Sequence, residues 1–273
     1  MYKGYIEGYF NNENLAAFYE NPNLIAENLK ENQYFIIKNL NEEIIDKYKK
    51  QNGELNQVSY KTIKNSYMGY IKPRNLEQEL AFDLLDDTQT KVKLIRGVYG
   101  SGKDYIMFAK ALELLEKGTH KKIIYIRPNV TVRDVPEIGH LPNGVFEKLS
   151  WTLGPLYDKV GGVEGVKLLI EQDKLELMPL LFIRGRSFED CIIYVSEGQN
   201  ITTEIAKLLL GRVGENSILL INADNHQTDN KIYDNDNGIA AMIDKLSGNK
   251  LFGYVYLNET LRSETANLAN LLD

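Results

Sequence analysis

The stretch KVKLIRGVYGSGKDYIMFAKALELLEK, residues 91–117, places a glycine-rich loop between an apolar run and an amphipathic run. A predicted strand, a tight glycine loop ending in lysine, and a predicted helix follow one another in the order of a phosphate-binding loop, or P-loop. Glycines let the backbone turn so that successive N–H groups point at one phosphate, and the start of the helix adds partial positive charge. The stretch therefore predicts a site for a nucleoside triphosphate, with ATP as the expected ligand.

The predicted chemistry of this loop depends on Lys103, whose ammonium would lie against the β- and γ-phosphates. A glycine-rich turn that merely ends in a lysine is the alternative, and the flanking strand and helix favour the P-loop. The residues expected to bind the nucleotide here are Gly97, Gly100, Ser101, Gly102, Lys103, Asp104 and Tyr105.

Outward from the loop, short apolar runs alternate with amphipathic stretches, which is typical of a parallel sheet covered by helices. One helix is predicted over Asp104–Lys117, ended by Gly118, and another over Thr202–Leu210, ended by Gly211. The predicted fold class is α/β: a three-layer P-loop NTPase with a mostly parallel sheet, plus a small N-terminal subdomain. The apolar runs predicted as strands are Val92–Ile95, Ile123–Ile126, Leu177–Ile183, Cys191–Val195, Ile218–Ile221 and Tyr254–Leu257.

The first part of the chain has a different composition, rich in tyrosine and asparagine. It contains one apolar run, Tyr34–Ile37, and one amphipathic stretch, Glu42–Lys50. The proline within Ile71–Asn75 prevents a continuous helix, so that segment is expected to be a linker. We therefore predict a small N-terminal subdomain over residues 1–70 and a P-loop ATPase domain over residues 71–273.

The composition is that of a globular protein, since 43% of the 273 residues are hydrophobic and 26% are charged. The net charge of −6 argues against a chain covered with basic surface for nucleic acid, and leaves room for a local basic patch. No run approaches the roughly 20 apolar residues of a membrane helix, and the start MYKGYIEGYF lacks the order of a signal peptide. A cytoplasmic protein without membrane contact is expected. Cys191 and the histidines lack metal-ligand spacing.

Two positions depart from the P-loop pattern where Mg²⁺ is expected. The residue after the P-loop lysine is ordinarily Ser or Thr, whose hydroxyl binds Mg²⁺, and here it is Asp104. The acidic pair expected after a buried strand reads Ser196-Glu197, after the run CIIYV. Because a carboxylate replaces a hydroxyl at one position and a hydroxyl replaces a carboxylate at the other, Asp104 and Ser196 are predicted to bind Mg²⁺ together. The alternative is that the metal site, and hydrolysis with it, has been lost.

Separated blocks of the chain resemble, in the same order, the PhoH-like ATPases, a bacterial and phage family related to superfamily 1 helicases. The resemblance covers residues 71–273 and is closest to the version that, in many relatives, follows a PIN-type ribonuclease domain. Residues 1–70 lack an obvious set of PIN carboxylates, so the resemblance implies the ATPase half alone. The blocks are Ile71–Asn75 with Gln78, the P-loop, Arg127-Pro128, Ile138–Pro142, Arg184–Ser187, Ser196–Asn200, Ala223-Asp224 with Gln227 and Asp229, Asn237-Gly238 and Leu261–Ser263.

Functional residues follow from the resemblance one by one. Gln78 matches a glutamine that reads adenine, although an exposed polar residue on a helix is the alternative. Glu197 matches the family's catalytic glutamate, a general base that polarises the attacking water. Gln227 matches a glutamine that senses the γ-phosphate, and Arg262 an arginine that neutralises charge in the transition state. Together with Lys103, the last three are the predicted catalytic residues.

The resemblance implies an ATPase coupled to single-stranded nucleic acid, RNA in preference to DNA. Arg184 and Arg186 match family arginines that face nucleic acid or a neighbouring subunit, with exposed loop charges as the alternative. Because helicases of this class usually pair two motor domains and one is predicted here, self-association is expected, with a ring as one form. The alternatives are a nucleotide-gated binding module without turnover, and a small-molecule kinase or phosphate-stress regulator.

Overall fold

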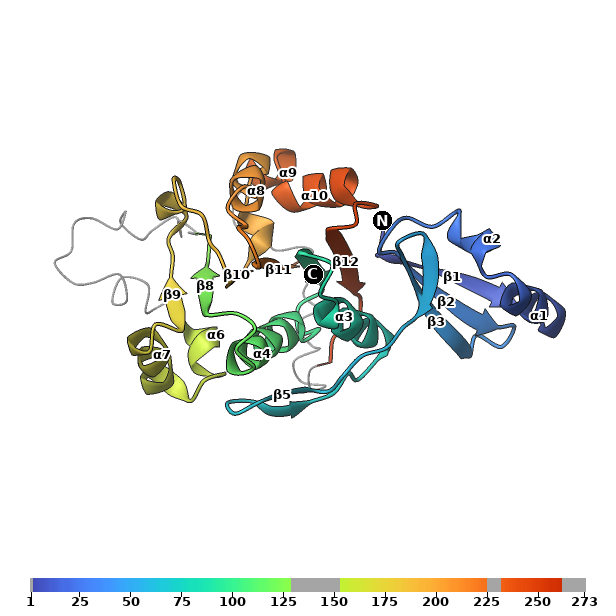
Figure 1. The fold of residues 1–273 in the computed structure, drawn as a ribbon, viewed down its shortest axis with the longest axis horizontal. Helices are drawn as coiled ribbons and strands as arrows, with labels where there is room; N and C mark the ends of the chain where they lie inside the picture. The colour runs from blue at the N-terminus through green and yellow to red at the C-terminus, as the bar shows by residue number, and fades with distance from the viewer. Residues whose placement is uncertain (1, 129–152, 225–231, 262–273) are drawn as a thin grey trace, which may run out of the picture.

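The computed structural model describes residues 2–128, 153–224 and 232–261 (Figure 1). Two predicted catalytic residues, Gln227 and Arg262, lie outside this part of the chain, so their roles stay predictions. Within it, no helix is long and apolar enough to cross a membrane.

A six-stranded sheet forms the centre of the molecule, and every neighbouring pair of its strands is parallel. The P-loop strand β7 lies between β12 and β11. Later strands of the chain therefore lie on both sides of β7, and the loop stands at the point where the strand order reverses. Ligands of open α/β sheets bind at such a point, beyond the carboxyl ends of the strands. In spatial order the strands are β12 (Phe252–Leu257), β7 (Val92–Gly97), β11 (Ile218–Asp224), β10 (Cys191–Val195), β8 (Lys122–Ile126) and β9 (Leu175–Leu177).

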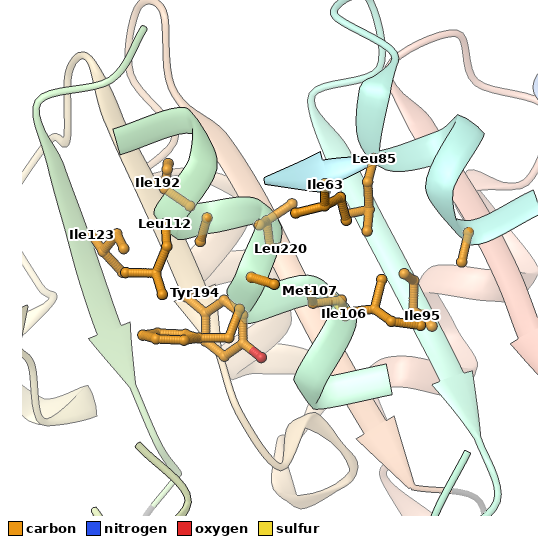
Figure 2. Close-up of a cluster of buried hydrophobic side chains, with 14 of the residues drawn as sticks. Ile63, Leu85, Ile95, Ile106, Met107, Leu112, Ile123, Ile192, Tyr194 and Leu220 are labelled. Atoms are coloured by element: carbon orange, nitrogen blue, oxygen red, sulfur yellow. The ribbon is translucent and has the colours of Figure 1, made fainter. Parts of the chain in front are cut away.

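Helices cover both faces of this sheet, which confirms the predicted three-layer α/β fold (Figure 1). Side chains of β10 alternate between the two faces of the sheet. Ile192 and Tyr194 pack with α4, whereas Ile193 and Val195 pack with the helices of the other face. Figure 2 shows the first of these cores, with Tyr194 beneath α4. One face carries α3 (Leu76–Asp86), α4 (Lys103–Glu116), α6 (Gly154–Tyr157) and α7 (Gly162–Glu171); the other carries α8 (Thr203–Leu210) and α10 (Gly238–Leu246), which follows the short α9 (Ile232–Asn235).

Local signals in the sequence account for several helix ends. Gly118 adopts φ +69° just after α4, and its N–H donates to the carbonyl of Leu115, as a left-handed residue after a helix does. The Thr202 hydroxyl accepts from the N–H of Ile205 and so caps α8. The prediction of one strand over Leu177–Ile183 was wrong. Strand β9 ends at Leu177, because Pro179 fixes φ and lacks an N–H, and a 3-10 turn, η2, covers Leu180–Phe182.

The N-terminal residues form a second, four-stranded sheet in the order β1-β2-β3-β4, with its own apolar cluster of Phe18, Leu29, Phe35 and Ile37. The amphipathic stretch Glu42–Lys50 is largely a strand. The elements are β1 (Tyr5–Phe10), α1 (Asn12–Glu20), α2 (Asn23–Ala26), β2 (Tyr34–Asn39), β3 (Ile44–Gln51) and β4 (Glu54–Gln57), followed by the hairpin of β5 (Ile63–Asn65) and β6 (Gly69–Ile71).

This N-terminal part packs against the half that contains the six-stranded sheet through buried polar contacts. The Tyr34 hydroxyl donates to the carbonyl of Leu80 in α3 at 3.1 Å, and the Asn32 amide donates to the carbonyl of Phe252 in β12 at 3.0 Å. Tyr34 also belongs to the main apolar core. A subdomain boundary at residue 70 stays a proposal, since the two parts share a core across it.

Candidate nucleotide-binding site

The P-loop lies between β7 and α4 in a conformation that requires glycine. Gly100 and Gly102 have φ of +76° and +82°, the left-handed region in which a side chain is strained. A Cβ on Gly97 would lie 2.6 Å from the carbonyl oxygen of Leu257. Gly102 is the N-cap of α4, and no side chain caps the helix there. The first-turn amides, which have no partner inside the helix, therefore face the position of a phosphate.

Lys103 is the first residue of α4, and its side chain is almost fully buried. Its ammonium lies 2.9 Å from Oδ2 of Asp224, at the end of β11, and 3.3 Å from the carbonyl oxygen of Val98 within the loop. Gln199 holds Asp224 in place, because its side-chain oxygen accepts from the Asp224 N–H at 2.9 Å. The P-loop lysine is thus paired with a carboxylate that an incoming phosphate would have to replace.

Gln78 connects α3 to the P-loop. Its side-chain N–H donates to the carbonyl of Ser101 at 3.0 Å, and its oxygen accepts from the N–H of Arg74 at 2.9 Å. The side chain is buried, so the exposed polar residue considered above is wrong. Beside it a cavity of about 530 Å³ opens between the segment before α3 and the start of α4. The cavity is lined by Tyr70, Ile71, Lys72, Pro73, Arg74, Gln78, Gly100, Gly102, Tyr105, Ile106 and Leu261.

Glu197 lies two residues after the end of β10 and has φ +57°, an uncommon conformation for a residue with a side chain. Its Oε2 accepts from the Gln199 amide at 2.6 Å, and its backbone N–H donates to Oδ1 of Asn222 at 3.1 Å. The Arg127 guanidinium lies 3.9 Å from the other carboxylate oxygen. Asn222 on β11 thus holds the strained backbone, and Gln199 and Arg127 hold the carboxylate near the carboxyl end of β10.

Asp104, the second residue of α4, is held by three protein donors. Its Oδ1 accepts from the Tyr194 hydroxyl at 2.6 Å and from the Asn222 amide at 2.6 Å. Its Oδ2 forms an ion pair with Lys159, whose side chain is 9% exposed. The carboxylate therefore connects α4 to β10, to β11 and to the segment between α6 and α7.

Two stacked tyrosines lie beneath this carboxylate. The rings of Tyr125 and Tyr194 are 5.8 Å apart and nearly parallel. Burial and the nearby charge of Asp104 raise the pKa of Tyr194 well above its usual value, so the hydroxyl keeps the proton that it donates to Asp104. Burial, with Asp104 as a second cause, raises the pKa of Tyr125 to about 12, and a hydrogen bond with Ser196 opposes that shift.

The predicted Mg²⁺ pair, Asp104 and Ser196, does not fit a resident metal as it is arranged. Both acceptor positions of Asp104 Oδ1 are used by protein donors, and an ion on Oδ2 would share that oxygen with the ammonium of Lys159. Ser196 is buried and engaged with Tyr125. Mg²⁺ prefers octahedral oxygen ligands with uncompensated charge. Among the described residues, no group of three or more His, Cys, Asp or Glu side chains could hold a metal ion.

The structure thus brings most of the predicted site residues to one edge of the sheet, and adds four that the sequence did not single out. Three of them are polar residues in or shortly after otherwise apolar strands: Tyr194, Gln199 and Asn222. A polar residue at such a position is a sequence signal that could have identified them as site residues. Lys159 carries no such signal, because tertiary packing alone places it beside Asp104. The loop arginines Arg184 and Arg186, which are apart from this site, pair with Glu204 and Glu176 respectively.

An uncapped glycine loop, a buried lysine and an adjoining cavity, at the carboxyl edge of a parallel sheet, define a P-loop nucleotide-binding protein of the ATPase type. A sequence profile of the family described as PhoH-like protein matches residues 70–270. The chain belongs to the PhoH-like family.

Three relatives show the extent of the similarity. Protein PhoH2 of Thermobispora bispora is 34% identical over 202 residues, which is 72% of this chain and 46% of that protein. Protein PhoH2 of Bacillus subtilis is 29% identical over 98% of this chain and 64% of its own length. A PhoH-like protein of the same organism is 37% identical over 49% of this chain and 42% of its own length. The chain therefore spans less than two thirds of each of these relatives.

Among solved structures, the DnaC helicase loader is similar with a TM-score of 0.32 and 12% identity, over 68% of this chain and 93% of that one. Bacteroides Pif1 bound to ssDNA gives a TM-score of 0.34 and 15% identity, over 72% of this chain and 44% of that one. Similarities this weak support no functional argument.

Proposed function

We propose that this chain binds ATP in the P-loop and hydrolyses it, with the reaction coupled to single-stranded nucleic acid, RNA in preference to DNA. The observation that carries the ATP part is the uncapped start of α4 with Lys103 buried at its first position. Burial makes that cation a strong partner for phosphate, since a charge-assisted hydrogen bond is stronger away from water. The adjoining cavity of about 530 Å³ has room for the base and sugar.

In the proposed reaction, the phosphates lie on the amides of the P-loop and take Lys103 from Asp224. Glu197 polarises a water molecule for in-line attack on the γ-phosphorus, and accepts its proton as the bond to the leaving oxygen breaks. Its strained backbone and its bond from Gln199 fix the direction of the carboxylate. Gln227 and Arg262 keep the roles that the family resemblance implies for them.

The nucleic-acid and assembly parts of the proposal rest on family membership. We propose a cytoplasmic protein that self-associates, with a ring as one form of assembly, because one motor domain of this kind needs a partner to complete a helicase-like site. Light scattering should then give a mass above the 31.2 kDa of one chain. A mass of one chain at micromolar concentration, with and without nucleotide, would contradict self-association.

A second candidate function, a nucleotide-gated binding module without turnover, is favoured by one observation. Asp104 stands where a metal-binding hydroxyl is expected, and its carboxylate is already occupied by Lys159, Tyr194 and Asn222. Release of inorganic phosphate from ATP separates the two functions. An ATPase coupled to RNA should release phosphate and do so faster with single-stranded RNA than with DNA, whereas a binding module should release none under either condition.

A further inference from the structure

Lys159 belongs to a buried polar cluster at the start of α4, together with Asp104, Tyr194 and Asn222. Its position is fixed by the chain on both sides, because the neighbouring Val160 and the preceding Leu156 are fully buried in the main core. The ammonium also lies 5.5 Å from the centre of the Phe108 ring. Lys159 is therefore a structured, largely buried cation and not a mobile surface lysine.

The position of the Lys159 ammonium is important because Asp104 lies beside it. Asp104 directly follows the P-loop lysine, so its side chain lies next to the amides that would receive the phosphates. A carboxylate at that place would repel a triphosphate. The ion pair with Lys159 and the bonds from Tyr194 and Asn222 cancel that repulsion within the protein.

We infer that Lys159 is a built-in cation of the nucleotide site, anchored by Asp104, that donates hydrogen bonds to phosphate oxygens in the place where P-loop proteins ordinarily use Mg²⁺. The inference rests on the proposed function, since it names how the same site holds its ligand. An ammonium has three donors, and Asp104 takes one of them, so two remain for an oxygen of a phosphate bound beside Asp104. The nucleotide should therefore bind without a divalent ion.

Calorimetric titration with a non-hydrolysable ATP analogue, in Mg²⁺ and in chelator, tests this inference. The wild-type protein should bind in chelator within about tenfold of its affinity in Mg²⁺. Lys159→Met should weaken binding in chelator by about tenfold or more, the loss expected for one charge-assisted hydrogen bond. Lys159→Arg, which keeps the charge, should bind more tightly than Lys159→Met. Lys167→Met is the matched control, since Lys167 is exposed and pairs with Glu164 on the same helix.

Lys159→Met leaves a partly buried carboxylate without its cation and can lower stability. The double variant Asp104→Thr with Lys159→Met removes both charges, and it should bind the analogue in Mg²⁺ but not in chelator. Two results would overturn the inference, provided that Lys103→Ala still loses binding. One is that Lys159→Met binds the analogue in chelator as the wild-type protein does, and the other is that the wild-type protein needs Mg²⁺ to bind it. If the wild-type protein and Lys103→Ala bind equally, or neither binds, the proposed nucleotide site itself is wrong.

Discussion

Lys103 of the P-loop and Asp224 at the end of β11 form an ion pair, with Nζ 2.9 Å from Oδ2 and both side chains largely buried. The pair connects the start of α4 to the end of β11, the strand that pairs with β7 from Leu219 to Asp224. It satisfies a buried cation when no phosphate is bound. Nucleotide binding and this ion pair therefore compete for the same ammonium.

The first prediction concerns that competition. Asp224→Asn should tighten ATP binding several-fold, because the phosphates no longer displace a carboxylate from Lys103. Lys103→Ala should weaken binding by more than about tenfold, since the phosphates lose a buried charge partner. Calorimetric titration measures both. Asp190→Asn is the control, because Asp190 pairs with exposed Lys121 at 2.6 Å, away from the P-loop. Weaker binding in Asp224→Asn would mean that the carboxylate positions Lys103 instead of competing for it.

The second prediction tests Glu197 as the general base. Glu197→Gln should bind ATP with nearly wild-type affinity and lose phosphate release by about 100-fold or more, the scale of general-base catalysis. The amide keeps the size of the side chain, and it can still lie beside Gln199. Glu204→Gln is a suitable control, since that side chain is 82% exposed. Loss of ATP binding in Glu197→Gln would show that the residue is structural.

The sequence was a sufficient guide at the P-loop turn and at strand β10, where the local signal is strong. The loop glycines allow the tight turn between β7 and α4, because they can adopt positive φ. The apolar run Cys191–Val195 is a strand over the same residues. Local pattern failed at Leu177, where Pro179 ends the strand despite the apolar residues beyond it. Apolarity alone does not distinguish a strand from a buried turn.

The polar network at Asp104 shows the opposite case, in which sequence distance hides the contact. Lys159 is 55 positions from Asp104, and Asn222 is 118 positions away. The pattern around Asp104 indicated an altered metal site, because a carboxylate in place of a hydroxyl is visible in the sequence. The cation that neutralises this carboxylate is visible only in the fold.

The third prediction concerns Lys93, a buried lysine near the start of β7, at the end of the strand that is away from the P-loop. Burial lowers the pKa of Lys93 to about 7, although its ammonium donates to the carbonyls of Leu85 and Asp87 at the end of α3. The unfolded chain keeps the ordinary pKa of 10.5. Between these values the unfolded state binds more protons than the folded state, so the free energy of unfolding should rise with pH, by up to about 1.4 kcal/mol per pH unit.

Urea unfolding at pH 7, 8 and 9 measures that slope, and Lys93→Met should flatten it because the titrating group is gone. The substitution also leaves the carbonyls of Leu85 and Asp87 without their donor, which lowers the free energy of unfolding by the same amount at every pH. Comparing the slopes of unfolding free energy against pH removes this constant effect. Lys250→Met, at an exposed position, should keep the wild-type slope. Equal slopes for Lys93→Met and the wild-type protein would mean that Lys93 stays charged in the folded state.

The last prediction measures how strongly the network at the P-loop holds Asp104. Tyr194→Phe removes the hydroxyl that donates to Asp104 Oδ1 at 2.6 Å and leaves the ring in its stack on Tyr125. Because the acceptor is a carboxylate, the free energy of unfolding should fall by about 1.5–3 kcal/mol. Tyr254→Phe is the matched control: in the described part of the chain its buried hydroxyl has no hydrogen-bond partner, so its loss should cost little.

A double-mutant cycle with Asp104→Asn separates the bond from other effects of losing the hydroxyl. Tyr194 and Asp104 share Asn222 as a partner, since its amide donates to Oδ1 of Asp104 at 2.6 Å and to the Tyr194 oxygen at 3.0 Å. Residues in one network couple by about 0.5–3 kcal/mol, so the two substitutions should be non-additive by that amount in urea unfolding. Additive losses would show that the hydroxyl and the carboxylate act independently.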